Sequence, residues 1–317
     1  MRPGVIAALL LLAAASGRAV AQPAALPADP EETLVEELVV NARLPGPAWW
    51  RVSDADTTIY ILGTPSALPR GQGWDRSIVE RRLTGAFALL TPPEAKAGLT
   101  DTPAFIGMMN RMRSKTPLAE ALSPALNTRF TAALKTMGKS ASAYAGWKPL
   151  AAGMLMARDF RKSARLDFDQ PDAAIRAIAR KKRVKVVPAG SFKAAAAAKV
   201  IVRDHTAEAG VACLAVALEE VEAGAGRLRA AGQAWAAGEV RTSMSGVRGY
   251  ERCAAQLPGA AELNRKALSD QTEAIARALK TPGHAVAIMG VRPLVSEDGV
   301  LQRLRARGYT VKTPGDT

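Results

Sequence analysis

The sequence predicts an α/β fold (α+β by a stricter definition), in which two β-α-β half-repeats form a mixed sheet and a long helical insertion separates them. A β-rich run, a glycine turn and a short amphipathic segment follow one another near residues 57–90 and again near residues 286–311. The residues between them carry apolar side chains at helical spacing. Strands that alternate with short helices are typical of parallel or mixed sheets. A chain of 317 residues is also long enough to bury a large core.

The first half-repeat begins with a predicted hairpin. Residues 49–53 and 57–62 are rich in β-branched and aromatic side chains, and the polar residues 54–56 join them. The turn Gly63-Thr64-Pro65-Ser66 ends the second strand. An amphipathic helix over residues 74–84 and a buried strand over residues 87–90 complete the unit, which Pro92 and Pro93 stop.

The middle of the chain is predicted to be mostly helical. Apolar side chains recur there at a period near 3.6 residues, interrupted by a β-branched strand over residues 184–187. Gly224 and Gly226 fall inside the longest predicted helix and are the positions at which it could break. The predicted helices cover residues 117–137, 143–160, 172–182, 207–237 and 260–279.

The second half-repeat repeats the pattern of the first. A predicted strand over residues 286–289 leads into the turn Gly290-Val291-Arg292-Pro293-Leu294, and Ser296 is expected to cap the following helix. Residues 309–311 form the predicted closing strand. The likeness between Ile61-Leu62-Gly63 and Ile288-Met289-Gly290 indicates two related halves, with chance similarity of common α/β units as the alternative.

Residues 1–21 are predicted to be a cleaved signal peptide. Arg2 supplies a positive start, residues 5–15 are apolar, and Ala19-Val20-Ala21 fits a cleavage site. The alternative is a membrane anchor, but the apolar run is shorter than the roughly 20 residues that span a bilayer. The mature protein is therefore expected to be periplasmic or secreted, and not transmembrane.

Residues 22–46 are predicted to form an extended leader (a linker rich in Pro, Ala and Glu) before one domain over residues 47–317. The acidic pairs Glu31-Glu32 and Glu36-Glu37 contrast with a basic body. We expect the leader to lie against that body.

The body is strongly basic. Lys and Arg number 43 against 29 Asp and Glu, which gives a net charge of +14. Aromatic residues make up 5% of the chain, and none lies near the densest basic run, Lys181-Lys182-Arg183, so nucleic-acid binding is not expected. The charge indicates either attraction to anionic envelope components or a solvated basic surface.

Cysteine and histidine are scarce. Export makes a disulfide between Cys213 and Cys253 the expected state, with buried free thiols as the alternative. The chain has only two histidines, His205 and His284, and this small number excludes a zinc site built from many His and Cys ligands. No glycine-rich phosphate-binding motif occurs, so no nucleotide cofactor is expected.

An ordered set of short motifs in residues 47–311 resembles the TraB/GumN family, which is similar to the TIKI metalloproteases. The resemblance implies a mixed sheet of two related halves, with a cleft where the two glycine turns meet. The motifs are Trp50-Arg51-Val52, Tyr60-Ile61-Leu62-Gly63-Thr64, Leu68-Pro69 with Trp74, Pro92-Pro93-Glu94, Ala234-Trp235-Ala236-Ala237-Gly238, Gly290 to Leu294, Asp298-Gly299-Val300-Leu301, Leu304, and Arg307-Gly308-Tyr309-Thr310-Val311.

The resemblance also implies a metal held by one histidine from each glycine turn and by a glutamate after the following strand. Ser66 and Pro293 stand at the histidine positions of this sequence, and Glu94 stands at the acidic position. Ser66 is a poor metal ligand and Pro293 has no side-chain donor, so no metal site and no cofactor are expected.

The resemblance therefore leaves three interpretations of the cleft positions Gly63, Thr64, Ser66, Glu94, Gly290, Arg292 and Pro293. The leading one is a catalytically degenerate protein that acts as a binding or structural module in the bacterial envelope. The second is a metal-dependent hydrolase or peptidase with an altered site around Glu94 as the candidate catalytic residue. In the third, Arg292 binds an anion at the cleft. Outside the second interpretation, Glu94 is expected to be a vestige of the metal site or to form an ion pair with an arginine such as Arg292.

Overall fold

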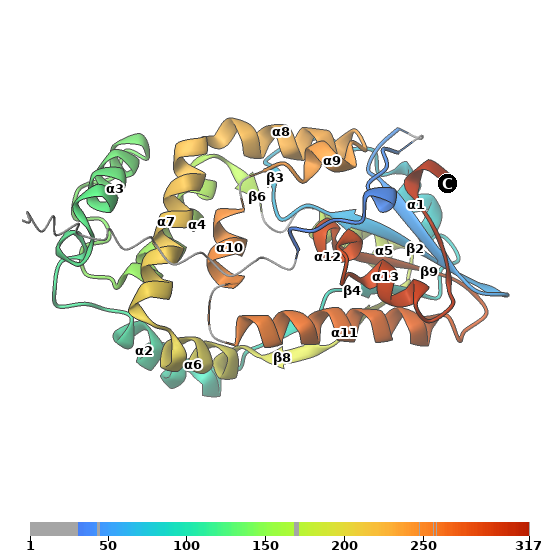
Figure 1. Ribbon diagram of the computed structural model, residues 1–317. Helices are drawn as coiled ribbons and strands as arrows, with labels where there is room; N and C mark the ends of the chain where they lie inside the picture. The colour runs from blue at the N-terminus through green and yellow to red at the C-terminus, as the bar shows by residue number, and fades with distance from the viewer. Residues whose placement is uncertain are drawn as a thin grey trace, which may run out of the picture.

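A mixed six-stranded sheet forms one end of the molecule, and a helical lobe extends from it (Figure 1). This computed structural model describes residues 31–42, 45–167, 171–246, 248–255, 257 and 259–316. The strands lie in the order β10-β1-β2-β9-β4-β7. They are β1 (Trp49–Ser53), β2 (Thr57–Thr64), β4 (Ala88–Thr91), β7 (Lys185–Pro188), β9 (Gly283–Gly290) and β10 (Thr310–Lys312).

The predicted hairpin and the mixed sheet are confirmed. Strand β1 pairs antiparallel with β2 and with β10, whereas β2, β9, β4 and β7 are parallel neighbours. Two further two-stranded sheets lie outside the main one. They pair β3 (Leu68–Pro69) with β6 (Leu166–Asp167) and β5 (Glu94–Lys96) with β8 (Ser191–Lys193).

The two β-α-β units interleave in the sheet. The first runs from β2 through α1 (Ser77–Leu83) to β4, and β9 lies between its strands. The second runs from β9 through α12 (Val291–Val295) and α13 (Val300–Arg305) to β10 at the sheet edge. Because β2 and β9 are adjacent and parallel, the glycine turns that follow them emerge side by side.

Most of the predicted helices form, with four changes. The predicted helix over residues 143–160 begins at Pro149 and ends at Ser163. The predicted helix over residues 207–237 breaks at Gly224, where φ is 79° and ψ is 158°, a region that essentially only glycine adopts. The first predicted helix of the middle begins at Pro124 rather than residue 117, with Ser123 as its cap. The prediction for Ser296 is wrong, because Ser296 follows α12 and Gly299 precedes α13.

Most helices of the middle form the lobe, whereas α5 and α11 lie beside the sheet (Figure 1) and α8 and α9 contribute residues to its core. The helices of the middle are α2 (Thr102–Arg111), α3 (Pro124–Thr136), α4 (Pro149–Ser163), α5 (Asp172–Lys181), α6 (Ala194–Asp204), α7 (Ala207–Ala223), α8 (Ala225–Ala236), α9 (Val240–Ser243), α10 (Gly249–Ala255) and α11 (Ala260–Ala278). In the described residues, no helix combines the length and the apolar character that a bilayer crossing requires.

The largest core surrounds the main sheet. Trp50, Ile61 and Ala287 are fully buried in it. A side chain at Gly63 would meet Trp50 and Val291 at 2.9 Å, so glycine is needed where β2 ends. The indole of Trp235 donates a hydrogen bond of 2.7 Å to the Gly63 carbonyl. The close contact fixes the end of β2 against α8 and α12.

A smaller core in the lobe contains the disulfide between Cys213 of α7 and Cys253 of α10, which confirms the predicted pairing. Both cysteines are fully buried. This bond holds α10 on α7, and the two helices carry the carboxylates of Glu251 and Glu220.

The described part of the leader packs on the body. The Val35 amide donates to the Val295 carbonyl (3.0 Å), Leu38 is fully buried, and the Trp50 indole donates to the Leu38 carbonyl (3.1 Å). Glu36 and Glu37 form ion pairs with Arg241 and Arg305, as the charge contrast indicates. Residues 1–30, which include the predicted signal peptide, lie outside the described residues. The division of the chain into three segments therefore stays a prediction.

Candidate functional site

A cavity of about 420 Å³ opens at the carboxyl ends of β2 and β9. Thr64 and Gly290 are register partners at these two strand ends. In open sheets with parallel strands, ligands bind at the carboxyl ends of the strands, where loops from neighbouring units meet. The position therefore suits a ligand site. Polar and charged residues of its lining include Thr64, Ser66, Arg161, Arg248, Glu251 and Arg292.

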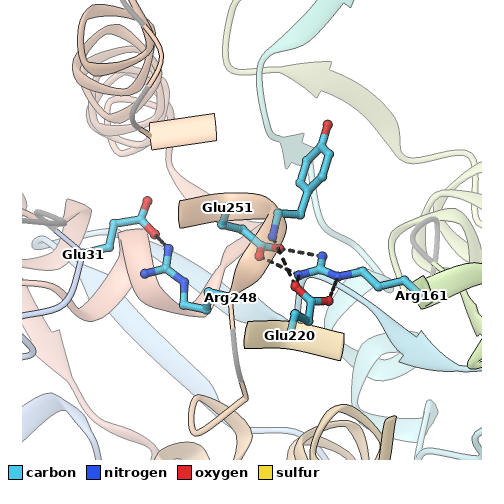
Figure 2. Close-up of polar contacts among 6 residues, drawn as sticks. Glu31, Arg161, Glu220, Arg248 and Glu251 are labelled. Carbon is cyan, nitrogen blue, oxygen red and sulfur yellow. Dashed lines mark hydrogen bonds and ion pairs between the residues drawn. The ribbon is translucent and has the colours of Figure 1, made fainter. Parts of the chain in front are cut away.

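A buried arginine forms the floor of the cavity on the lobe side. Arg161 of α4 has an exposed fraction of 2% and lies between Glu220 of α7 and Glu251 of α10 (Figure 2). It donates to both oxygens of Glu220, with the Nη2 bond at 3.0 Å. It also donates to both oxygens of Glu251, at 2.9 and 2.8 Å. Forked contacts of this kind fix a guanidinium in position.

The two carboxylates differ in their acidity. Burial raises the pKa of Glu220, and the hydrogen bonds from Arg161 offset this only in part. Burial also acts to raise the pKa of Glu251, but the hydrogen bonds and charge of Arg161 outweigh it, with help from the Ser66 hydroxyl, and hold that pKa below its usual range. Burial disfavours the Arg161 cation, yet Glu251 and Glu220 together raise its pKa. Glu251 is thus an ionised carboxylate at the cavity.

The opposite side of the cavity carries two more arginines and the start of the described leader. The Arg248 Nη2 donates to the Glu31 carboxylate, and the two side chains have exposed fractions of 17% and 23% (Figure 2). Arg292, in α12, donates to the main-chain oxygens of Glu31 (3.1 Å) and Met244 (2.6 Å). These carbonyls hold the guanidinium at the mouth of the cavity.

The structure brings most of the predicted cleft positions together. Thr64, Ser66, Gly290, Arg292 and Pro293 all line the cavity. Gly63 directly precedes the lining residue Thr64 in the sequence, and its backbone packs closely against Trp50 and Val291.

Glu94 lies elsewhere. It is in β5, has an exposed fraction of 46%, and accepts a hydrogen bond of 3.1 Å from Arg176. The expected arginine partner is therefore Arg176 and not Arg292. The two glycine turns meet because β2 and β9 are neighbours, whereas β5 belongs to a separate two-stranded sheet.

Sequence reasoning missed Arg161, Glu220, Arg248 and Glu251. One signal was present, because Arg161 follows Ala157 and Phe160 on the buried face of α4, and Glu220 follows Val216 and Ala217 on that of α7. A charged residue within an apolar stripe indicates a buried ion pair, since an unpaired buried charge is costly. Its partner could not be predicted, because it lies 59 positions away.

The cavity does not fit the metal that the resemblance implies. Ser66 and Pro293 occupy the motif positions, and the oxygens of Glu251 already accept hydrogen bonds from Arg161. His284 lies at the other end of β9, where its Nε2 lies 3.1 Å from the Arg82 carbonyl oxygen. Across the described residues, no group of three or more His, Cys, Asp or Glu side chains is placed to hold a metal ion.

Comparison with known proteins identifies the class of the chain. Residues 48–313 match the TraB/PrgY/gumN family, and the chain belongs to that family. The match spans the sheet, the lobe and every residue of the cavity except Glu31. The same comparisons found no similar curated protein and no similar solved structure.

Proposed function

We propose that this protein is an exported TraB/PrgY/gumN family member that acts in the bacterial envelope as a ligand-binding module and has lost metal-dependent hydrolysis. Family membership supplies the scaffold, and the cavity at the ends of β2 and β9 supplies the binding site. The motif positions Ser66 and Pro293 support the loss of the metal.

One observation carries the proposal. Two arginines of the cavity pair with carboxylates that also line it, Arg161 with Glu251 and Arg248 with Glu31. Guanidinium groups at a cavity wall are suited to planar anions and to hydrogen-bond acceptors. A carboxylate that a guanidinium already engages on both oxygens is a poor metal ligand and a poor general base.

Two features support export. The disulfide between Cys213 and Cys253 fits an oxidising compartment, and residues 1–21 carry the pattern of a signal peptide. Expression of the full chain with a C-terminal tag, cell fractionation and N-terminal sequencing of the purified protein test this part. We expect a periplasmic or secreted product that begins at Gln22.

Metal analysis and a peptidase assay test the loss of activity. The mature protein is purified without chelators, its divalent metal is measured by mass spectrometry, and it is incubated with a mixed peptide library. We expect substoichiometric metal and no cleavage. Stoichiometric metal together with cleavage that Glu94→Ala abolishes would establish the hydrolase interpretation instead. Cleavage lost in Glu251→Gln would place the active centre in the cavity. The exposed Glu120→Gln variant is the control.

A further inference from the structure

The leader places a carboxylate of the protein's own chain in the cavity. Glu31 lines the cavity together with Arg248 and Arg292, and its carboxylate accepts a hydrogen bond from Arg248 Nη2. Its main-chain oxygen accepts one from Arg292 Nη1. The leader thus presents to these arginines a group that guanidinium recognises well, a carboxylate with a carbonyl beside it.

The remaining contacts of the leader do not depend on the Glu31 side chain. The Glu297 amide donates to the Thr33 carbonyl (3.1 Å), the Val35 amide donates to the Val295 carbonyl (3.0 Å), and Leu38 is buried in the main core. These contacts anchor the leader next to the cavity. The Glu31 side chain can therefore leave Arg248 while the rest of the leader stays in place.

The other end of the cavity has a different character. There Arg161 is held by two carboxylates through four hydrogen bonds, and its exposed fraction is 2%. Arg248 is more accessible and pairs with a Glu31 side chain that is 23% exposed. The Glu220 side chain is 0% exposed, and Glu251, although 24% exposed, is held by two hydrogen bonds from the buried Arg161. An ion pair whose two side chains both have partial solvent access is weaker than one with a buried guanidinium, so an incoming anion can replace Glu31 more readily than Glu220 or Glu251.

We infer that Glu31 is an intramolecular competitor for the ligand, and that the ligand carries a carboxylate which binds Arg248 and Arg292 when the Glu31 side chain moves away. The inference rests on the proposed ligand-binding function and names the chemical class of the ligand. The leader then regulates the site, because ligand affinity is reduced by the fraction of molecules in which Glu31 occupies Arg248.

Competition predicts a gain of binding when Glu31 loses its charge. Succinate serves as the carboxylate probe and inorganic phosphate as the comparison anion, with calorimetry on the mature protein at constant ionic strength. We expect Glu31→Gln to bind succinate at least about tenfold more tightly than the unsubstituted protein, which corresponds to about 1.4 kcal/mol. Glu31→Asp, which keeps the charge, is expected to fall between the two.

The matched control is Glu36→Gln. Glu36 lies on the same leader and forms an ion pair with Arg241, which does not line the cavity. This variant changes the net charge by the same amount and is expected to leave succinate affinity unchanged. Adding Arg248→Gln to Glu31→Gln is expected to remove the gain. Circular dichroism and the unfolding midpoint confirm that each variant is folded.

Each other outcome overturns the inference. Equal succinate affinity in Glu31→Gln and the unsubstituted protein, or no succinate binding in either, shows that Glu31 does not compete. An equal gain in Glu36→Gln shows an effect of net charge. An equal gain for phosphate shows a general anion site rather than a carboxylate site. These results leave the proposed function to its own test, because metal content and peptide cleavage are measured independently of Glu31.

Discussion

Arg161 organises the cavity through charges that are withdrawn from water. Its guanidinium donates four hydrogen bonds to Glu220 and Glu251, and the Glu220 side chain has an exposed fraction of 0%. The Glu220 carboxylate also accepts a hydrogen bond of 3.2 Å from the Tyr250 amide. A buried ion pair adds little net stability, but removal of one partner leaves an uncompensated charge. The structure of the cavity floor is therefore expected to be more sensitive to loss of Arg161 than to loss of an exposed arginine.

Arg161→Met is expected to lower the free energy of unfolding by about 3–5 kcal/mol near neutral pH, because two carboxylates lose their cation. Without Arg161 the pKa of both carboxyls rises, so the folded state binds protons more tightly than the unfolded state. The loss of stability is then smaller near pH 5 than near pH 8, since stability falls as pH rises through a raised carboxyl pKa. Urea unfolding of the variant and the unsubstituted protein at the two pH values measures the difference in the free energy of unfolding.

Arg158→Met is the control for this substitution. Arg158 lies on the same helix, has an exposed fraction of 60% and pairs with Asp159. Loss of an exposed pair changes stability by roughly 0.5 kcal/mol or less. A similar small loss in both variants would contradict the role assigned to Arg161.

At the residue scale, the family resemblance predicts that the two glycine turns meet at one cleft. Thr64, Ser66, Gly290 and Pro293 belong to these turns, and the structure places them around the same cavity. Arg161, Glu220 and Glu251 come from three helices that meet only in the tertiary structure. Glu94 could not be placed, because the pairing of β5 with β8 is not encoded in its neighbours.

The break between α7 and α8 is a feature of the element scale. The apolar stripe of the sequence continues from Leu214 to Trp235, but Gly224 ends α7 and turns the chain into α8. Helix α8 can then bring Leu228, Ala231 and Gly232 to the cavity wall. The apolar periodicity predicts which residues are helical but not where the helix bends, because Gly224 and Gly226 are both compatible with a weak continuous helix. The backbone angles of Gly224 decide between these possibilities.

The two glycines are expected to respond in opposite directions to alanine. Gly224→Ala is expected to cost about 1–3 kcal/mol, because a residue with a Cβ is strained at a φ of 79° and a ψ of 158°. Gly226→Ala is expected to stabilise by about 0.5–1 kcal/mol, because Gly226 lies within α8 with open space around its Cβ position. Thermal and urea unfolding of both variants measure the difference. Equal effects would mean that the two helices are continuous in solution.

At the scale of the whole molecule, positive charge is found far from the cavity as well as around it. The net charge is +14, and a second hollow of about 410 Å³ is lined by residues of α2 and α6. These two helices lie away from the main sheet (Figure 1). The lining of this hollow combines small or apolar residues with three cations and contains no Asp or Glu. The lining residues are Ala104, Gly107, Met108, Arg111, Lys199, Val202 and Arg203. We predict that this surface attracts an anionic, partly apolar partner such as the headgroup region of an anionic bilayer.

The protein is expected to bind vesicles that contain anionic lipid, to bind neutral vesicles weakly, and to dissociate as salt screens the attraction. A basic residue near an anionic membrane contributes about 1 kcal/mol, so Arg111→Gln with Lys199→Gln is expected to weaken binding by about thirtyfold. Vesicle co-sedimentation measures it. The control pair, Arg277→Gln with Lys280→Gln, removes the same charge at exposed positions at the end of α11. An equal loss in the control would show that net charge alone drives the attraction, and unchanged binding in both would place the contact surface elsewhere on the molecule.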